Sequence, residues 1–307
     1  VPPSTCVPCG AALAASWDVD LLERVGALLG REARARGCRV LLAPTVNIVR
    51  SPLAGRNFEC YGEDPLLSGR VAAAFVRGVE REGVIATVKH FVGNEAETER
   101  YWSSSVIDER PLREIYLRPF EIAVREGGAL AVMTAYNRVN GRWVSERRDL
   151  VTDVLRDEWG FDGIVMTDWF AVAGTVESAL AGVDLEMPGP ARAYGAALAD
   201  AVRAGALDEA VVDSMITRLL TTFDRVGALD APTPDANGDA PPQQTDADRG
   251  LAREAAAAGM VLLLNDGVLP IDPVALRRVA VIGPNAAVAQ IMGGGSSRVT
   301  PHRLVAP

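Results

Sequence analysis

One pattern constrains the fold of this chain more than any other: amphipathic helical segments alternate with short, continuous apolar runs from about residue 16 to 228. Continuous apolar runs, rather than runs in which polar and apolar residues alternate, are typical of strands that are buried on both faces. The runs that we expect to form strands are 40–44, 84–88, 130–133, 163–166 and 181–187. Buried strands separated by helices predict an α/β fold with a parallel sheet that helices cover on both sides.

The helical segments repeat large apolar residues every three or four positions, which places these residues on one face of a helix. The pattern is strongest at 21–29 and 66–79. A third segment, 111–126, is expected to be split at Pro119, because proline lacks the backbone N–H of a helix interior.

Polar side chains follow the expected strands at the point where each strand ends. A (β/α) TIM-like barrel and an open doubly wound sheet both agree with the alternation of elements. The barrel is favoured because the carboxyl ends of all its strands meet on one face, where active sites lie. The polar and aromatic residues at these strand ends are Asn47, Arg50, Lys89, His90, Tyr136, Asn137, Asp168 and Trp169.

The charge balance argues against two classes of partner. The chain has 31 Lys and Arg against 40 Asp and Glu, a formal net charge of −9, which disfavours nucleic acid and anionic membranes. No run of 18 apolar residues predicts a membrane span. The absence of a leader pattern favours the cytoplasm, but the chain starts without Met, so a signal peptide before Val1 stays open. A homo-oligomer also stays open.

The cysteines favour free thiols. Cys6 and Cys9 have the CxxC spacing of zinc and redox sites, but no second Cys/His pair stands at a metal-like spacing. Four cysteines in 307 residues are too few for a disulfide-stapled secreted domain.

The chain is expected to have three parts, which are a barrel at 1–228, a linker at 229–248 and the start of a second α/β domain at 249–307. The linker is rich in Pro, Asp, Gln and Thr and has no apolar periodicity. In the third part we expect a helix at 249–259, then apolar strand-like runs at 261–264 and 279–283.

Four residues at strand ends suggest sugar chemistry. A carboxylate at Asp168, followed by Trp169, suits a nucleophile that attacks an anomeric carbon beside an aromatic ring that holds a sugar. Taken alone, Asp168 is more often a helix N-cap. Lys89 and His90 suit donors to sugar hydroxyls, and the competing interpretation of His90 is a satisfied core histidine.

A series of motifs in a fixed order carries a resemblance to a known family. They are LAPTVNIVR (42–50), GRNFE (55–59), GEDP (62–65), KHFVGN (89–94), LREIYL (112–117), MTAYN (133–137), GFDG (160–163), TDW (167–169) and LEMPG (185–189). On these motifs the chain resembles glycoside hydrolase family 3 over nearly all its length. Asn94 with Glu97 and Arg100 looks like the β-glucosidase branch of that family.

The resemblance implies roles for individual residues. Asp168 matches the catalytic nucleophile, and Arg50 with Lys89 should keep it ionised. The substrate-binding residues that it implies are Arg50, Lys89, His90, Met133, Tyr136 and Trp169. Among these, Tyr136 would pack near the nucleophile, and Met133 and Trp169 would form an apolar wall.

The implied activity is that of a retaining, exo-acting β-glucosidase. Such an enzyme hydrolyses terminal non-reducing β-D-glucosyl residues of β-glucosides or oligosaccharides by double displacement. No motif requires a metal or an organic cofactor. Compared with the family, the chain lacks the first barrel strand with its Asp-Gly-Pro motif, and the acid/base glutamate is expected beyond residue 307. Glu186 is a poor substitute, so the chain alone is expected to be poorly active.

Three alternatives stay open. The first is a β-xylosidase or another β-glycosidase of the same family. The second is a catalytically incomplete sugar-binding fragment. The third is a phosphate-binding enzyme on a doubly wound sheet. It is disfavoured because the glycine-rich run 293–297 is a weak phosphate-loop signal and the turn Gly283-Pro284-Asn285 does not match the dinucleotide fingerprint.

Overall fold

The computed structural model describes residues 3–230, 244–291 and 294–306. Its α-helices are α1 (Gly10–Ala14), α2 (Val19–Ala35), α3 (Pro65–Arg81), α4 (Glu109–Pro111), α5 (Arg118–Arg125), α6 (Thr175–Ala181), α7 (Ala196–Arg203), α8 (Glu209–Arg225) and α9 (Asp246–Ala258). Its strands are β1 (Val40–Leu41), β2 (Ile85–Phe91), β3 (Ser104–Ser105), β4 (Ala131–Thr134), β5 (Arg138–Val139), β6 (Arg142–Trp143) and β7 (Ile164–Thr167). Shorter helical turns are η1 (Asn57–Glu59), η3 (Val144–Glu146), η5 (Pro284–Ala286) and η6 (Gly295–Ser297), and η2 (Leu112–Tyr116) and η4 (Asp149–Glu158) are π-helical.

The main sheet contains β1, β2, β4 and β7, all parallel and in the order in which they follow along the chain. Each new strand is therefore added on the same side of the previous one. A doubly wound sheet would instead reverse direction at a switch point. The strand order confirms the expected α/β fold and corresponds to part of a TIM-like barrel.

The expected fifth strand, 181–187, is wrong as a strand. The segment lies beside β7 and makes several hydrogen bonds to it, but the pairing amounts to a single isolated bridge between Met166 and Leu185 and not to a ladder. Pro188 and Pro190 follow at once and have no N–H groups for a ladder, which explains why the pairing stops. Strand β1 is also shorter than expected, since the pairing continues after Pro44 only as a bridge between Thr45 and Lys89.

The strands separate two apolar cores, because successive side chains of a strand point to opposite faces. The core on the barrel-interior face, called here the interior cluster, contains the buried residues Ile85, Ala131, Met133, Ile164 and Met166. The alternate residues Ala86, Val88, Val132 and Val165 face the helices and belong to a larger core. Both faces are buried, as the continuous apolar runs predicted.

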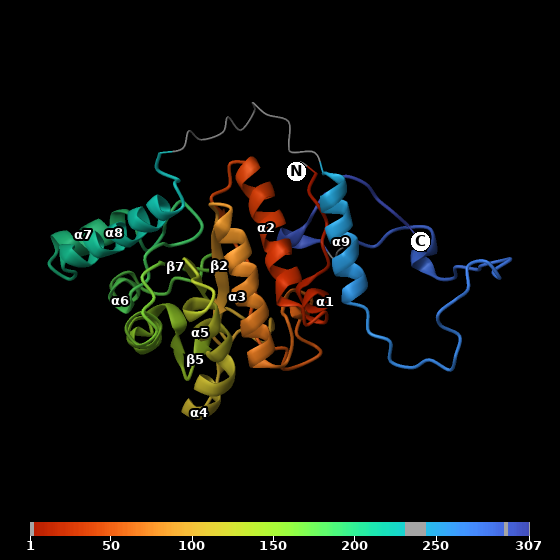
Figure 1. Cartoon of the computed structure of the whole chain (residues 1–307). Coiled ribbons are helices and arrows are strands. Elements are labelled where there is room, and N and C mark those ends of the chain that lie inside the picture. The colour runs from red at the N-terminus through yellow and green to blue at the C-terminus, as the bar shows by residue number, and fades with distance from the viewer. Residues whose placement is uncertain (1–2, 231–243, 292–293, 307) are drawn as a thin grey trace.

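Helices α2 and α3 form the outer layer over this larger core and lie side by side (Figure 1). Glycines let their backbones touch. A Cβ atom at Gly26 would lie 2.4 Å from the carbonyl oxygen of Phe75, and one at Gly78 would lie 2.1 Å from that of Glu23. The helices expected at 21–29 and 66–79 are therefore confirmed as α2 and α3. The expected break near Pro119 is also confirmed, because η2 ends at Tyr116 and α5 begins at Arg118.

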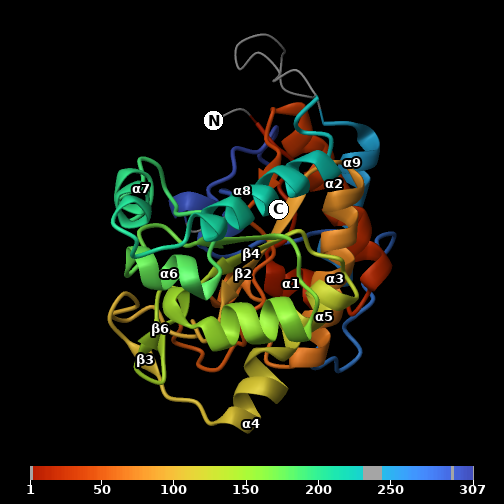
Figure 2. The same ribbon diagram turned by 90° about the vertical axis from the view of Figure 1, so that its left-hand side faces the viewer.

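Helices α6, α7 and α8 form a separate group beside the sheet, with a small core around Tyr194 and Leu198. Leu219 and Phe223 of α8 also pack against the interior cluster. Figure 2 shows α8 next to β2 and β4, in agreement with these contacts. The short strands β3, β5 and β6 form a second sheet near α4.

The segment after α9 differs from the rest of the described chain. Helix α9 packs on α1 and α2, which confirms the helix expected at 249–259. The strands expected at 261–264 and 279–283 are wrong: neither run pairs with a described strand, and Leu263 and Ile282 are each 91% exposed. Figure 1 shows the chain after α9 extending away from α2 and α9 and then returning, and Pro301 forms a bridge with Ser4. Most of the expected linker, residues 231–243, and Gly293 of the glycine-rich run lie outside the described residues.

In the structure, Cys6, Cys9, Cys38 and Cys60 are free cysteines. Within the described ranges, no helix is both long and apolar enough to cross a membrane.

Candidate active site

Asp168 lies at the carboxyl end of β7 and is 6% exposed. Its backbone N–H donates to the carbonyl oxygen of Thr134 at 3.2 Å, which ties the residue to the end of β4. Its Oδ1 accepts a hydrogen bond from the backbone N–H of Trp169 at 2.7 Å. Its Oδ2 is buried and has no hydrogen-bond partner among the described residues. One oxygen is thus held in place, and the other is available to a reacting atom.

Lys89 and His90 reach this carboxylate from β2. The ladder between β2 and β4 shifts register between Lys89 and Phe91, because Lys89 pairs with Met133 and Phe91 with Thr134. His90 is the extra residue, and an irregularity of this kind re-aims a side chain. His90 Nε2 lies 3.4 Å from Asp168 Oδ2, and His90 is 2% exposed. The structure therefore brings His90 to Asp168, as the strand-end pattern predicted.

Arg56 and Glu59 lie beside Lys89 in the loop around η1. Arg56 Nε donates to Glu59 Oε1 at 2.5 Å, Thr45 Oγ1 donates to Glu59 Oε2 at 2.8 Å, and Lys89 Nζ is 3.9 Å from the same oxygen. The sequence suggested a structural ion pair of Arg56 with Glu59, and that pair is confirmed. It gave no signal that the charge of Arg56 also acts on Asp168.

Arg50 lies after β1, in the loop that leads to η1. Its side chain is exposed. Burial raises the pKa of Glu95 to about 7 and also raises that of Tyr116, and the charge of Arg50 opposes both shifts only in part. The cations whose charges lower the pKa of Asp168 are Arg56 and Lys89. The sugar-binding role of Arg50 stays a prediction, and Arg56 is an additional cation whose charge acts on Asp168.

Tyr136, after β4, is buried near the carboxylate. Burial first, and then the charge of Asp168, raise the pKa of Tyr136. The guanidinium of Arg100 lies 4.3 Å from the centre of the Tyr136 ring and is held by Glu97 at 2.7 Å. Asn94 Nδ2 in turn donates to Glu97 at 3.3 Å. Asn94, Glu97 and Arg100, on which the resemblance to one branch of the family rests, thus form one chain of contacts that ends on Tyr136.

Met133 and Trp169 supply apolar surface next to these polar groups. Met133 is 1% exposed and belongs to the interior cluster, and Trp169 packs against the same cluster from its position directly after Asp168. A pocket that combines an apolar wall with a few fixed polar groups is typical of small-molecule sites.

Burial dominates the electrostatics of the site. Desolvation raises the pKa of Asp168. The hydrogen bonds from the Trp169 backbone and from the Tyr136 side chain, and then the charges of Arg56 and Lys89, lower it only in part. Burial also lowers the pKa of Lys89 and, together with the charges of Arg56, Lys89 and Arg100, that of His90. The expectation that neighbouring cations keep Asp168 ionised did not include this desolvation.

Glu186 has a structural role. It is 5% exposed, and its two carboxylate oxygens accept hydrogen bonds from the backbone N–H groups of Arg192, Ala193 and Tyr194 at 2.7–3.0 Å. This agrees with the expectation that Glu186 is not the acid/base. Among the described residues, no group of three or more His, Cys, Asp and Glu side chains is placed to hold a metal ion.

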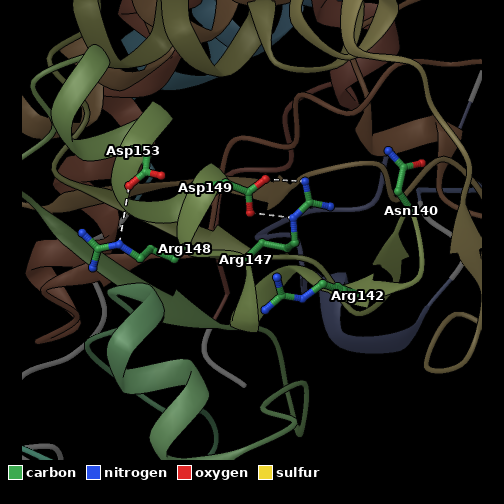
Figure 3. Close-up of a pocket in the computed structure, with 6 residues that line it drawn as sticks. All are labelled: Asn140, Arg142, Arg147, Arg148, Asp149 and Asp153. Carbon is green, nitrogen blue, oxygen red and sulfur yellow. Dashed lines mark hydrogen bonds and ion pairs between the residues drawn. The ribbon is translucent and has the colours of Figure 1, made fainter.

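A second hollow, which Asp168 does not line, is rich in arginine. Its lining residues are Asn140, Arg142, Arg147, Arg148, Asp149 and Asp153 (Figure 3). Arg147 donates to Asp149 at 2.7 Å, Arg148 lies 3.6 Å from Asp153, and Arg142 donates to the carbonyl oxygen of Glu146. Because each arginine already has an acceptor, this hollow is a surface ion-pair cluster rather than an anion site.

A family model matches most of the chain. The description of the model is "Glycosyl hydrolase family 3 N terminal domain", and it covers residues 2–222. A β-glucosidase of Rhizobium radiobacter is 52% identical over 304 residues, and the match covers 99% of this chain and 37% of that protein. A probable β-glucosidase I of Aspergillus niger is 46% identical, again over 99% of this chain and 37% of the relative.

Solved structures agree with this relationship. A β-glucosidase from Kluyveromyces marxianus in complex with glucose superposes with a TM-score of 0.93 at 39% identity and covers 99% of this chain and 37% of that one. A family 3 β-glucosidase from Bifidobacterium adolescentis superposes with a TM-score of 0.88 at 38% identity, over 99% and 44% of the two chains. The chain thus spans about 37% of the length of the curated relatives that it matches.

Proposed function

Since the chain belongs to glycosyl hydrolase family 3 through that family's N-terminal domain, we propose that it forms the catalytic barrel of a retaining β-glucosidase, with Asp168 as the nucleophile. The observation that carries the proposal is the unpartnered Oδ2 of a buried carboxylate at a strand end, flanked by His90 and by the charges of Lys89 and Arg56. A nucleophilic carboxylate needs one accessible oxygen in a fixed position.

In the proposed reaction, Asp168 Oδ2 attacks the anomeric carbon, the bond to the leaving oxygen breaks, and a general acid gives that oxygen a proton. Water then attacks the anomeric carbon of the glycosyl-enzyme, its proton goes to the same acid/base group, and the bond to Oδ2 breaks. The two carboxyl groups of a retaining enzyme lie about 5–5.5 Å apart.

The substrate class is a terminal non-reducing β-D-glucosyl residue of a β-glucoside or oligosaccharide. The names of the relatives and the glucose in the Kluyveromyces marxianus structure support glucose as the sugar. In the proposal, Lys89, His90 and Arg50, with Arg56 beside them, meet the sugar hydroxyls, and Met133, Trp169 and Tyr136 form the wall next to the sugar. The position of His90 and Lys89 beside Asp168 and Glu59, and the packing of Met133 and Trp169 in the interior cluster, support it.

The domain division is part of the proposal. We propose a barrel at 1–228, a linker at 229–248 and the opening of a second α/β domain at 249–307, supported by a family match that ends at residue 222. The four free thiols support a reducing compartment, the cytoplasm.

The nucleophile is tested by covalent labelling. The reagent is a 2-deoxy-2-fluoro-β-glucoside that carries a dinitrophenolate leaving group. Because dinitrophenolate departs without a general acid, the test depends on the nucleophile alone. We expect mass spectrometry to find one fluoroglucosyl group on the peptide that contains Asp168.

The matched controls are two substitutions of carboxylates. Asp168→Asn should abolish labelling, whereas Asp153→Asn, in the surface hollow, should leave it unchanged. Label on another carboxylate, or undiminished label in the Asp168→Asn protein, would falsify the assignment. A folded chain that takes no label at all would contradict the claim that this barrel holds a reactive site.

A further inference from the structure

The side chain of Asn47, which follows β1, brackets the backbone of His90. Asn47 Nδ2 donates to the carbonyl oxygen of His90 at 3.0 Å, and the backbone N–H of His90 donates to Asn47 Oδ1 at 2.8 Å. A backbone N–H only donates and a carbonyl oxygen only accepts. The two bonds therefore fix which side of the amide is oxygen and which is nitrogen.

This orientation determines the proton on the imidazole. Asn47 Oδ1 also lies 3.1 Å from His90 Nδ1. An amide oxygen has lone pairs and no proton, so Nδ1 must be the donor and carries the hydrogen. Glu95 supports the arrangement, because its Oε1 accepts from Asn47 Nδ2 at 3.3 Å.

The other ring nitrogen then carries a lone pair. Burial and the charges of Arg56, Lys89 and Arg100 lower the pKa of His90, which favours the neutral ring. In a neutral ring with Nδ1–H, Nε2 is an acceptor, and it lies 3.4 Å from Asp168 Oδ2, another acceptor without a partner. A buried acceptor without a donor is unfavourable, so a hydrogen-bond donor between His90 Nε2 and Asp168 Oδ2 would stabilise this arrangement.

We propose that Asn47 is a positioning residue that fixes His90 as the Nδ1–H tautomer, so that Nε2 accepts a hydrogen bond from a sugar hydroxyl beside Asp168. The sugar part rests on the proposed function, whereas the tautomer does not. The inference reverses the role expected from the sequence, in which the imidazole donates to the sugar. A site built in this way selects ligands that carry a hydroxyl donor at that position, because an analogue without it leaves both acceptors unpaired.

The tautomer is measured by long-range ¹H–¹⁵N NMR of the whole chain labelled with ¹⁵N-histidine. The chain has only two histidines, so the spectrum of a His302→Gln variant assigns both. We expect His90 to be neutral at pH 7 with the proton on Nδ1. A proton on Nε2 in the wild-type chain would overturn the proposal, and this result needs no variant to fold.

Substitution at Asn47 tests the cause. In Asn47→Leu the ring loses the acceptor at Nδ1 and keeps Asp168 Oδ2 near Nε2, so the proton is expected to move to Nε2. Asn137→Leu is the matched control: Asn137 is 1% exposed and its Nδ2 donates to two backbone carbonyls, those of Val92 and Arg138. An unchanged tautomer in Asn47→Leu, or the same shift in both variants, would refute the role of Asn47.

The two proposals fail separately. An Nδ1–H signal with no fluoroglucosyl label leaves the tautomer intact and contradicts the glucosidase proposal. Label on Asp168 together with an Nε2–H signal supports the glucosidase proposal and overturns the proposed tautomer.

Discussion

Two regions of the molecule contain nearly the same kind of sequence and have different structures. The run 84–88 (VIATV) lies in and beside β2, between β1 and β4, and Ile85 is 0% exposed. The run 279–283 (VAVIG) forms no strand, and Ile282 is 91% exposed. An apolar run thus indicates that a segment suits a strand, but the strand forms only where neighbours pair its backbone groups and cover its side chains.

The largest expected difference between these regions is in amide hydrogen exchange. Amides of β2 and β4 should exchange through global unfolding and therefore at least about a thousandfold more slowly than those of 260–283. Exchange measured by mass spectrometry on peptides from each region checks this. Strong protection of 260–283 would mean that this segment folds against a surface that the structure does not show.

A matched pair of core and tail substitutions should differ strongly in stability. Phe91 is fully buried, with its ring 5.2 Å from Phe120 and 6.2 Å from Trp159 between centroids. Phe91→Ala should lower the free energy of unfolding by about 3–5 kcal/mol. Leu263→Ala, at an exposed site, should change it by less than about 0.5 kcal/mol. Urea unfolding monitored by tryptophan fluorescence measures both changes. Equal losses of unfolding free energy in the two variants would contradict the difference between a packed core and an exposed tail.

The barrel should also show a pH dependence that comes from a buried carboxyl. Glu80 Oε1 accepts from the backbone N–H groups of Leu130 at 2.9 Å and Ala86 at 3.3 Å, and burial raises its pKa from 4.5 to about 8. Because the folded state holds this proton more tightly, the stabilisation is complete below pH 4.5 and is lost as the pH rises towards 8.

Glu80→Gln should therefore flatten the decline in unfolding free energy between these pH values, since the amide keeps an acceptor oxygen and does not titrate. Unfolding curves at several pH values for both proteins provide the measurement. An unchanged slope in the variant would show that Glu80 is not the group responsible.

The smallest expected effect concerns the border between the regions, at α2 and α9. Asp18 Oδ1 caps α2 by accepting from the backbone N–H of Leu21 at 2.9 Å, and Asp18→Ala should lower the stability of the barrel by about 1 kcal/mol. Thr245 caps α9, because its side chain and that of Asp248 form a reciprocal capping box. Thr245→Ala should speed amide hydrogen exchange within α9 alone. An equal loss of barrel stability would contradict this and would mean that α9 unfolds together with the barrel.

Sequence reasoning predicted the barrel and the meeting of Asp168, Lys89 and His90, because the geometry of parallel strands brings their carboxyl ends together. It missed Arg56, which reaches the site from an irregular loop whose path no periodicity describes. It also missed the contacts of Asn47, since the orientation of an amide depends on partners that are distant in sequence. The strands expected after α9 do not form, because neither apolar run has a described strand with which to pair.

The role of Asp168 is tested most directly by azide rescue of an Asp168→Ala variant with 2,4-dinitrophenyl β-glucoside. In the absence of the carboxylate, azide can attack the anomeric carbon from the face that Asp168 occupied, and dinitrophenolate leaves without needing an acid. The account predicts that the variant forms α-glucosyl azide, which NMR identifies by its anomeric proton. Formation of β-glucosyl azide, or hydrolysis by the variant at the wild-type rate, would contradict the account, because either result requires a nucleophile other than Asp168.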